Sequence, residues 1–117
     1  MTITHSEMVA ALVKPGDAII QSLTPETMDL LHAAVGISGE AGELLDAVKK
    51  AAIYNKPIDR ENVIEELGDL EFYMEQLRQR IGVSRGETLA ANIAKLSVRY
   101  QGLRYTDQAA QDRADKA

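Results

Sequence analysis

Two pairs of acidic residues with helical spacing are the feature of this sequence that most strongly suggests chemistry. Glu40 and Glu43 form an E-x-x-E pair, and Glu66 and Asp69 form an E-x-x-D pair further along the chain. Residues three apart lie on one face of a helix, so each pair presents its two carboxylates together. Carboxylate oxygens, without His or Cys in the set, are ligands for hard cations such as Mg²⁺ or Mn²⁺. The pattern therefore predicts a metal site shared by two helices.

Capping residues predict the helices that carry these pairs. Thr24 before Pro25 is typical of a helix start, and Asp59 and Ser84 can cap two further helices. Gly82 is placed to end the helix between them. The predicted helices cover residues 4–13, 25–53, 60–81 and 85–101, with a short one within 106–117. No segment alternates with period two, so the sequence predicts an all-α fold, a small antiparallel helix bundle.

Apolar residues form one narrow stripe on each of the two long helices, at about 100° per residue. The stripes are Leu30, Ala34, Ile37, Ala41, Leu44 and Val48 on the first helix, and Val63, Leu67, Leu70, Met74, Leu77 and Ile81 on the second. Both acidic pairs lie on the same rotational side of their stripes, so they face one another if the helices pack antiparallel. Carboxylates crowded at the margin of a core repel and lose hydration, which favours a bound cation.

Ordinary interpretations compete with this one. Pairs of acids at this spacing are common in acidic helical proteins, where they mark a solvated face. Gly39, Gly42 and Gly68 stand among the acidic residues, although each glycine costs about 1 kcal/mol in a helix interior relative to Ala. They indicate close approach of a backbone or room for a ligand. Tight helix–helix packing is the alternative.

A basic row follows the apolar stripe of the helix predicted at 85–101. Asn92, Lys95 and Arg99 lie on one flank of this stripe, with the same handedness as the acidic pairs. An amide, a mobile ammonium group and a planar guanidinium fork suit the oxygens of a polyphosphate. A salt-bridged surface is the competing interpretation.

Composition excludes several classes of function. The chain has 117 residues, no cysteine and a net charge of -5. The absence of cysteine excludes disulfides and thiolate chemistry, and the negative charge argues against binding a nucleic-acid backbone. No apolar run reaches the roughly 18 residues of a membrane span, and the first residues lack a signal-peptide pattern, so we expect a cytoplasmic protein without membrane contact. A chain of this length buries a modest core, which favours a homo-oligomer.

Three segments, in order, resemble the MazG-like nucleotide pyrophosphohydrolases: HAAVGISGEAGELLDAVKK at 32–50, EELGDLEFYMEQL at 65–77 and NIAKLSVRY at 92–100. The resemblance implies a helical core over residues 25–104, between an N-terminal segment 1–24 and a tail 105–117. It also implies Mg²⁺-dependent cleavage of a nucleoside triphosphate between its α and β phosphates, giving a monophosphate and pyrophosphate, by a homodimer or homotetramer. The stretch 101–105 departs from the Pro-aromatic continuation of many family members, which leaves the preferred base open.

On this hypothesis the metal ligands and catalytic residues are Glu40, Glu43, Glu66 and Asp69, and the substrate-binding residues are Tyr73, Asn92, Lys95, Arg99 and Tyr100. Glu43, or alternatively Glu40, acts as general base towards the attacking water. Tyr73 either contacts the nucleotide or packs. The alternatives are another pyrophosphate-containing nucleotide, such as phosphoribosyl-ATP or a modified deoxynucleotide, and a non-catalytic helical interaction module. A di-iron bundle is set aside because no histidine supplies an E-x-x-H pair.

Overall fold

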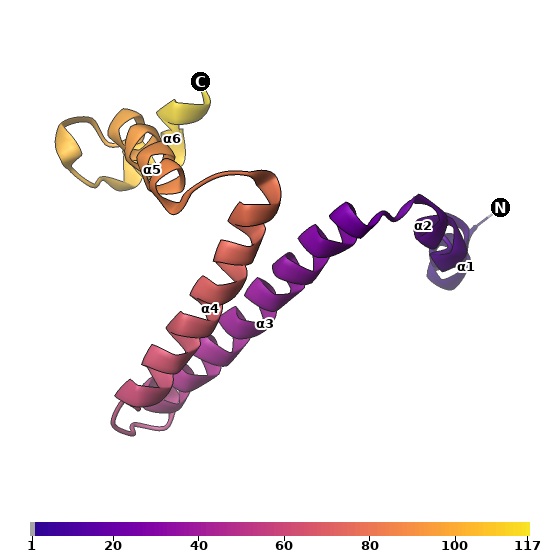
Figure 1. Ribbon diagram of the computed structural model, residues 1–117, viewed down its shortest axis with the longest axis horizontal. Helices are drawn as coiled ribbons and strands as arrows, with labels where there is room; N and C mark the ends of the chain where they lie inside the picture. The colour runs from indigo at the N-terminus through magenta and orange to yellow at the C-terminus, as the bar shows by residue number, and fades with distance from the viewer. Residues whose placement is uncertain (1) are drawn as a thin grey trace.

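The computed structural model describes residues 2–117, and every regular element within that range is helical (Figure 1). The α-helices are α1 (His5–Leu12), α2 (Gly16–Ser22), α3 (Pro25–Ile53), α4 (Arg60–Ile81), α5 (Arg85–Arg99) and α6 (Asp107–Asp112). Two 3₁₀ turns, η1 (Gln101–Leu103) and η2 (Ala114–Lys116), follow α5 and α6. The predicted all-α fold is confirmed.

The helix boundaries follow the capping residues of the sequence. The Thr24 side chain accepts a hydrogen bond from the backbone N–H of Thr27 at 3.1 Å, and Pro25 occupies the first turn of α3. Asp59 accepts in the same way from the backbone N–H of Asn62 at 3.1 Å, at the start of α4. Gly82 ends α4 with φ 74°, a left-handed conformation that glycine adopts without steric cost. Local sequence therefore sets the ends of both long helices.

Two local features differ from the sequence-based expectation. The sequence predicted no helix between residues 13 and 25, but Pro15 is the N-cap of a second helix there, α2. A proline disfavours a helical conformation at the residue before it, yet its own φ of −62° suits a helix start. The helix α5 ends at Arg99, two residues before the predicted end, because Tyr100 leaves the helical conformation with φ −115° and ψ 82°. Gly102, with φ 69°, lies within the η1 turn that follows.

The antiparallel pair α3 and α4 is the one extensive helix–helix contact among residues 2–117, and it forms the long arm in the middle of Figure 1. The α5 helix contacts η1, α6 and η2 instead. All other pairs of described elements touch marginally at most. The acidic pairs thus lie on two helices that pack together, whereas the basic row lies on a separate part of the chain.

The face that joins α3 to α4 is rotated away from the predicted apolar stripes, toward the acidic flank. Ala33 and Ala47 are the buried apolar residues of α3, and the predicted stripe residues Ala34, Ala41 and Val48 are exposed. On α4 the stripe is likewise divided: Val63, Leu70, Met74 and Leu77 are half-buried, while Leu67 and Ile81 are exposed. Small side chains let the two helix backbones approach closely on this face. The prediction that each whole stripe is buried is wrong for a single chain.

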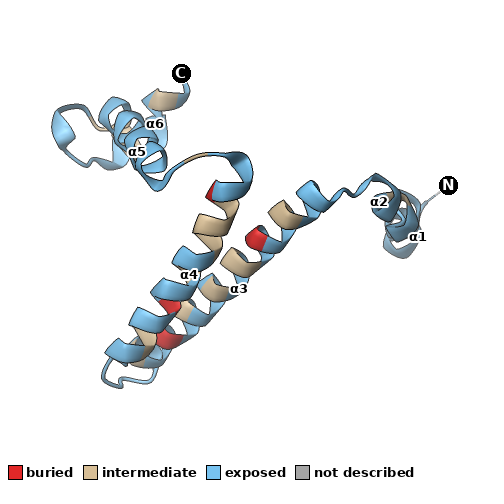
Figure 2. Cartoon of the chain, in the orientation of Figure 1, coloured by how far each residue is buried: buried red, intermediate tan, exposed pale blue. Residues whose placement is uncertain are grey.

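Most of the chain is exposed, as the extent of pale blue in Figure 2 shows. Many large apolar side chains are among the exposed residues. No large side chain within residues 2–117 is fully buried. The radius of gyration is 20.2 Å, compared with about 13 Å for a compact domain of this length. One chain alone does not enclose a core. None of the described helices combines the length and the apolar character that crossing a membrane requires.

Candidate metal centre

Three carboxylates from the two long helices converge where α3 and α4 pack together. Glu40 and Glu43 come from α3 and Glu66 comes from α4. One carboxylate oxygen of each residue lies within 4.8 Å of one oxygen of each of the other two. Among residues 2–117, these three residues form the group that could hold a metal ion. The antiparallel packing that the sequence predicted is what brings Glu66 to the pair on α3.

Glu66 is the most unusual member of this group. The residue is only 8% exposed, and its Oε2 atom is buried without a hydrogen-bond partner. Burial raises the pKa of its carboxyl group to about 7, assisted by a hydrogen bond with Glu40 and by repulsion from Glu43, Glu40 and Asp69. A buried polar atom without a partner is costly, and native proteins rarely retain one without a functional reason.

The donor set fits a hard divalent cation. All three side chains offer oxygen atoms, and no histidine or cysteine belongs to the group. Oxygen ligands select Mg²⁺, Ca²⁺ or Mn²⁺ over softer metals. A cation at this point would supply the missing partner of Glu66 Oε2 and cancel the mutual repulsion of the carboxylates. The residues present therefore fit the metal that the sequence predicted.

Asp69 lies outside the group of three. It is exposed on α4, one turn after Glu66, and its negative charge contributes to the raised pKa of Glu66. The group that the structure assembles is thus Glu40, Glu43 and Glu66, with Asp69 close enough to act on it electrostatically.

The glycines near the acidic pairs have open space beside them. A Cβ atom added at Gly39, Gly42 or Gly68 would meet no atom within 4 Å, so packing within this chain does not explain them. The glycine that requires close approach is Gly36, which the sequence analysis missed. Its added Cβ would lie about 2.4–2.5 Å from carbon atoms of the Tyr73 ring. The available signal was its place beside Ala33 on the small-residue face of α3.

Tyr73 packs against α3 at this point. Its ring lies across Gly36 and makes edge contacts with His32, at a centroid distance of 6.1 Å, and with Phe72, at 5.1 Å. The structure therefore gives Tyr73 a packing role between the helices.

Substitution of Gly36 by Ala is expected to loosen the α3–α4 pair, because the new methyl group overlaps the Tyr73 ring. Overpacking of this kind costs about 1–3 kcal/mol. Chemical denaturation followed by circular dichroism should show the loss in the free energy of unfolding. Gly39→Ala is the matched control: its Cβ enters open space and alanine favours helix, so its stability should stay equal or rise. Equal effects of the two substitutions would contradict the proposed contact.

The predicted substrate-binding residues of α5 do not reach the carboxylates within one chain. Asn92 and Lys95 are exposed, and Lys95 forms no ion pair among residues 2–117. Arg99 is engaged with Asp115, and the Tyr100 ring lies 5.6 Å from the ring of Tyr105. Because α5 has no more than marginal contact with α3 or α4, the basic row and the acidic group are separate in a single chain.

Comparison with known proteins identifies one family. A family model described as the MazG nucleotide pyrophosphohydrolase domain matches residues 29–103, which span most of α3, all of α4 and α5, and η1. The matched region includes all three converging carboxylates and the basic row. No curated protein and no solved structure matches the chain significantly.

Proposed function

Because the chain belongs to the MazG nucleotide pyrophosphohydrolase domain family, we propose that it hydrolyses a nucleoside or deoxynucleoside triphosphate between the α and β phosphates. The products are a nucleoside monophosphate and pyrophosphate. The observation that carries this proposal is the convergence of Glu40, Glu43 and Glu66 around a buried oxygen without a partner. Asp69 joins them as the fourth ligand in the proposed site.

The carboxylates have two tasks in the proposed reaction. Glu40, Glu43, Glu66 and Asp69 would hold Mg²⁺, or Mn²⁺ in its place, and the bound ion would neutralise phosphate oxygens and lower the pKa of a water molecule. Glu43 accepts a proton from the attacking water. The water oxygen forms a bond to the attacked phosphorus. The bond from this phosphorus to the oxygen that bridges the α and β phosphates breaks, and its electron pair stays on the departing group. Glu43 suits the role of base because it is exposed beside the buried Glu66.

The basic row of α5 completes the site in this proposal. Lys95 and Arg99 stabilise negative charge on the phosphates, and Asn92 and Tyr100 orient the sugar or a phosphate. Since α5 is separate from the α3–α4 pair within one chain, these groups come from a second copy of the chain. Tyr73 then supports the site through its packing against α3.

The uncovered apolar surface supports a homo-oligomer, either a dimer or a tetramer. Three of the six stripe residues on α3 and two of the six on α4 are exposed, among them Val48, Leu67 and Ile81. Beside them lies an apolar pocket of about 310 Å³ lined by Ile37, Met74 and Leu77, among others. A monomer seldom exposes apolar surface on this scale, whereas the core of an obligate interface is made of it. A second copy would bury this face and enclose the core that one chain lacks.

A nucleotide panel tests the proposed activity. Purified protein is incubated with ribo- and deoxynucleoside triphosphates, phosphoribosyl-ATP and modified deoxynucleotides, with Mg²⁺ or with a chelator, and pyrophosphate is measured. We expect pyrophosphate release from at least one nucleotide with Mg²⁺ and none with the chelator. Orthophosphate as the first product would refute the proposed bond cleavage. Activity on one modified nucleotide alone would support the proposed bond cleavage and identify that nucleotide as the substrate.

A further inference from the structure

A carboxylate of the chain itself fills the guanidinium fork of Arg99. The Arg99 Nε donates to Asp115 Oδ1 at 2.7 Å, and Nη2 donates to Asp115 Oδ2 at 3.2 Å. The two side chains are only 15% and 5% exposed, which makes this the most buried ion pair among residues 2–117. The predicted phosphate-binding arginine is therefore occupied by an internal anion.

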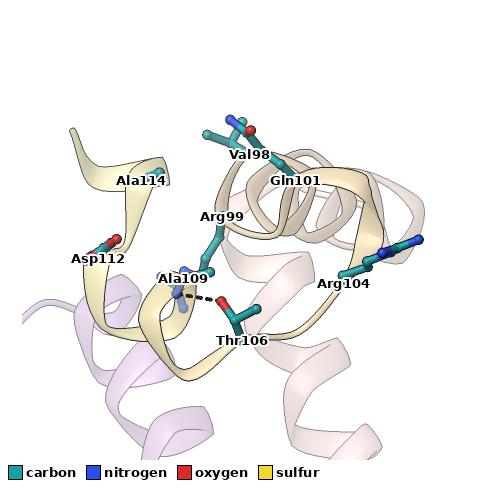
Figure 3. Close-up of a pocket in the computed structure, with 8 residues that line it drawn as sticks. All are labelled: Val98, Arg99, Gln101, Arg104, Thr106, Ala109, Asp112 and Ala114. Atoms are coloured by element: carbon teal, nitrogen blue, oxygen red, sulfur yellow. Dashed lines mark hydrogen bonds between the residues drawn. The ribbon is translucent and has the colours of Figure 1, made fainter.

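Three short elements hold Asp115 in this place. Thr106 caps α6, accepting from the Ala109 N–H at 2.9 Å, and Arg113 has φ 49°, which turns the chain back into η2. The η2 turn then packs on α5 and delivers Asp115 to Arg99. Figure 3 shows Arg99 projecting from α5 toward α6, while Arg104 points away from it.

Arg99 lies beside an open cavity as well as beside Asp115. It lines a pocket of about 430 Å³, together with Gln101, Arg104 and Thr106 among others (Figure 3). The hydrogen bonds from Arg99 hold the pKa of Asp115 below its usual value, so Asp115 is ionised at neutral pH. The pair thus combines an ionised carboxylate, two hydrogen bonds from one guanidinium group and an open cavity beside it.

We propose that Asp115 is a latch that competes with a substrate phosphate for Arg99, so that the nucleotide binds fully only when residues 113–117 leave α5. This inference rests on the proposed function, because it takes Arg99 to be a phosphate ligand. A carboxylate and a phosphate present the same pair of oxygens to a guanidinium fork. Asp115 takes the Nε–Nη2 edge of the guanidinium, so a phosphate that binds through this edge must displace it.

The latch lowers the apparent affinity for phosphates in proportion to the time it is closed. A ligand that binds only the open form has its dissociation constant raised by the reciprocal of the open fraction. The docked segment is short, and the ion pair is its principal polar link to α5. Substrate can therefore displace it without disturbing the α3–α4 pair.

The test measures binding of inorganic tripolyphosphate, with Mg²⁺ present, by calorimetry. Asp115→Asn removes the charge but keeps the shape, and we expect it to bind tripolyphosphate about tenfold more tightly than the wild type. Asp115→Ala, which removes the carboxylate altogether, should behave alike and serves if the Asn variant folds poorly. Asp115→Glu keeps the anion and should stay near the wild type. Asp112→Asn, the same charge change three residues earlier, controls for general electrostatic attraction and should also stay near the wild type.

Unchanged or weaker binding by Asp115→Asn and Asp115→Ala would overturn the latch, as would an equal gain in Asp112→Asn. Nucleotide hydrolysis, measured in parallel, separates this outcome from failure of the proposed function. Tighter tripolyphosphate binding by the Asp115 variants, without any nucleotide hydrolysis, would support the latch as a control on anion binding and contradict the proposed reaction. Hydrolysis with unchanged affinity in the Asp115 variants would keep the reaction and reject the latch.

Discussion

Replacement of Glu66 by Gln is expected to lower kcat/KM for the best nucleotide by at least about 100-fold, because a neutral amide is a weaker ligand for Mg²⁺ than a carboxylate and does not balance its charge. Gln has nearly the shape of Glu, so the packing between α3 and α4 is retained. Pyrophosphate release at saturating Mg²⁺ is the measurement.

The matched control is Glu65→Gln, the same change at the adjacent, exposed position of α4. It should retain nearly full activity. Without metal, Glu66→Gln should melt no lower than the wild type, because the substitution removes a buried carboxylate that its neighbours repel. Near-normal hydrolysis by Glu66→Gln would place the chemistry elsewhere.

Substitution of Ile81 by Glu is expected to dissociate the oligomer and abolish the activity with it. Ile81 is 57% exposed in the single chain and lines the apolar pocket beside α4. The proposed second copy would cover it, and a carboxylate buried there without a partner weakens association by at least about 100-fold. Sedimentation equilibrium should show a dimer or tetramer for the wild type and a monomer for the variant.

Ile81→Val is the control for this experiment, since it keeps an apolar side chain at the position. It should remain oligomeric and active. Ile81→Glu should keep the helix content of the wild type, because position 81 is exposed in the single chain. A wild-type protein that sediments as an active monomer would reject the shared site.

The features that the sequence predicted correctly depend on short-range rules. Thr24, Asp59 and Gly82 mark the ends of α3 and α4 because capping uses residues within one turn of the boundary. The convergence of Glu40 and Glu43 with Glu66 followed from helical periodicity and an antiparallel turn. Capping needs no knowledge of distant contacts, and the convergence of the carboxylates needs only the antiparallel packing of two neighbouring helices.

The features that escaped prediction depend on how elements dock. The α3–α4 contact lies on the face that carries Ala33 and Gly36, and the need for glycine at position 36 becomes apparent only when Tyr73 is opposite it. The ion pair of Arg99 with Asp115 joins residues sixteen apart, across η1, α6 and the start of η2. Periodicity assigns no contact across such connections, so Arg99 was expected to be free for substrate.

A Mn²⁺ titration followed by electron paramagnetic resonance shows whether Glu40, Glu43 and Glu66, with Asp69 beside them, share a divalent cation. We expect saturable Mn²⁺ binding that excess Mg²⁺ displaces, together with a melting temperature that rises with metal concentration. Mn²⁺ that stays free in solution at every protein concentration, with an unchanged melting temperature, would contradict the shared cation.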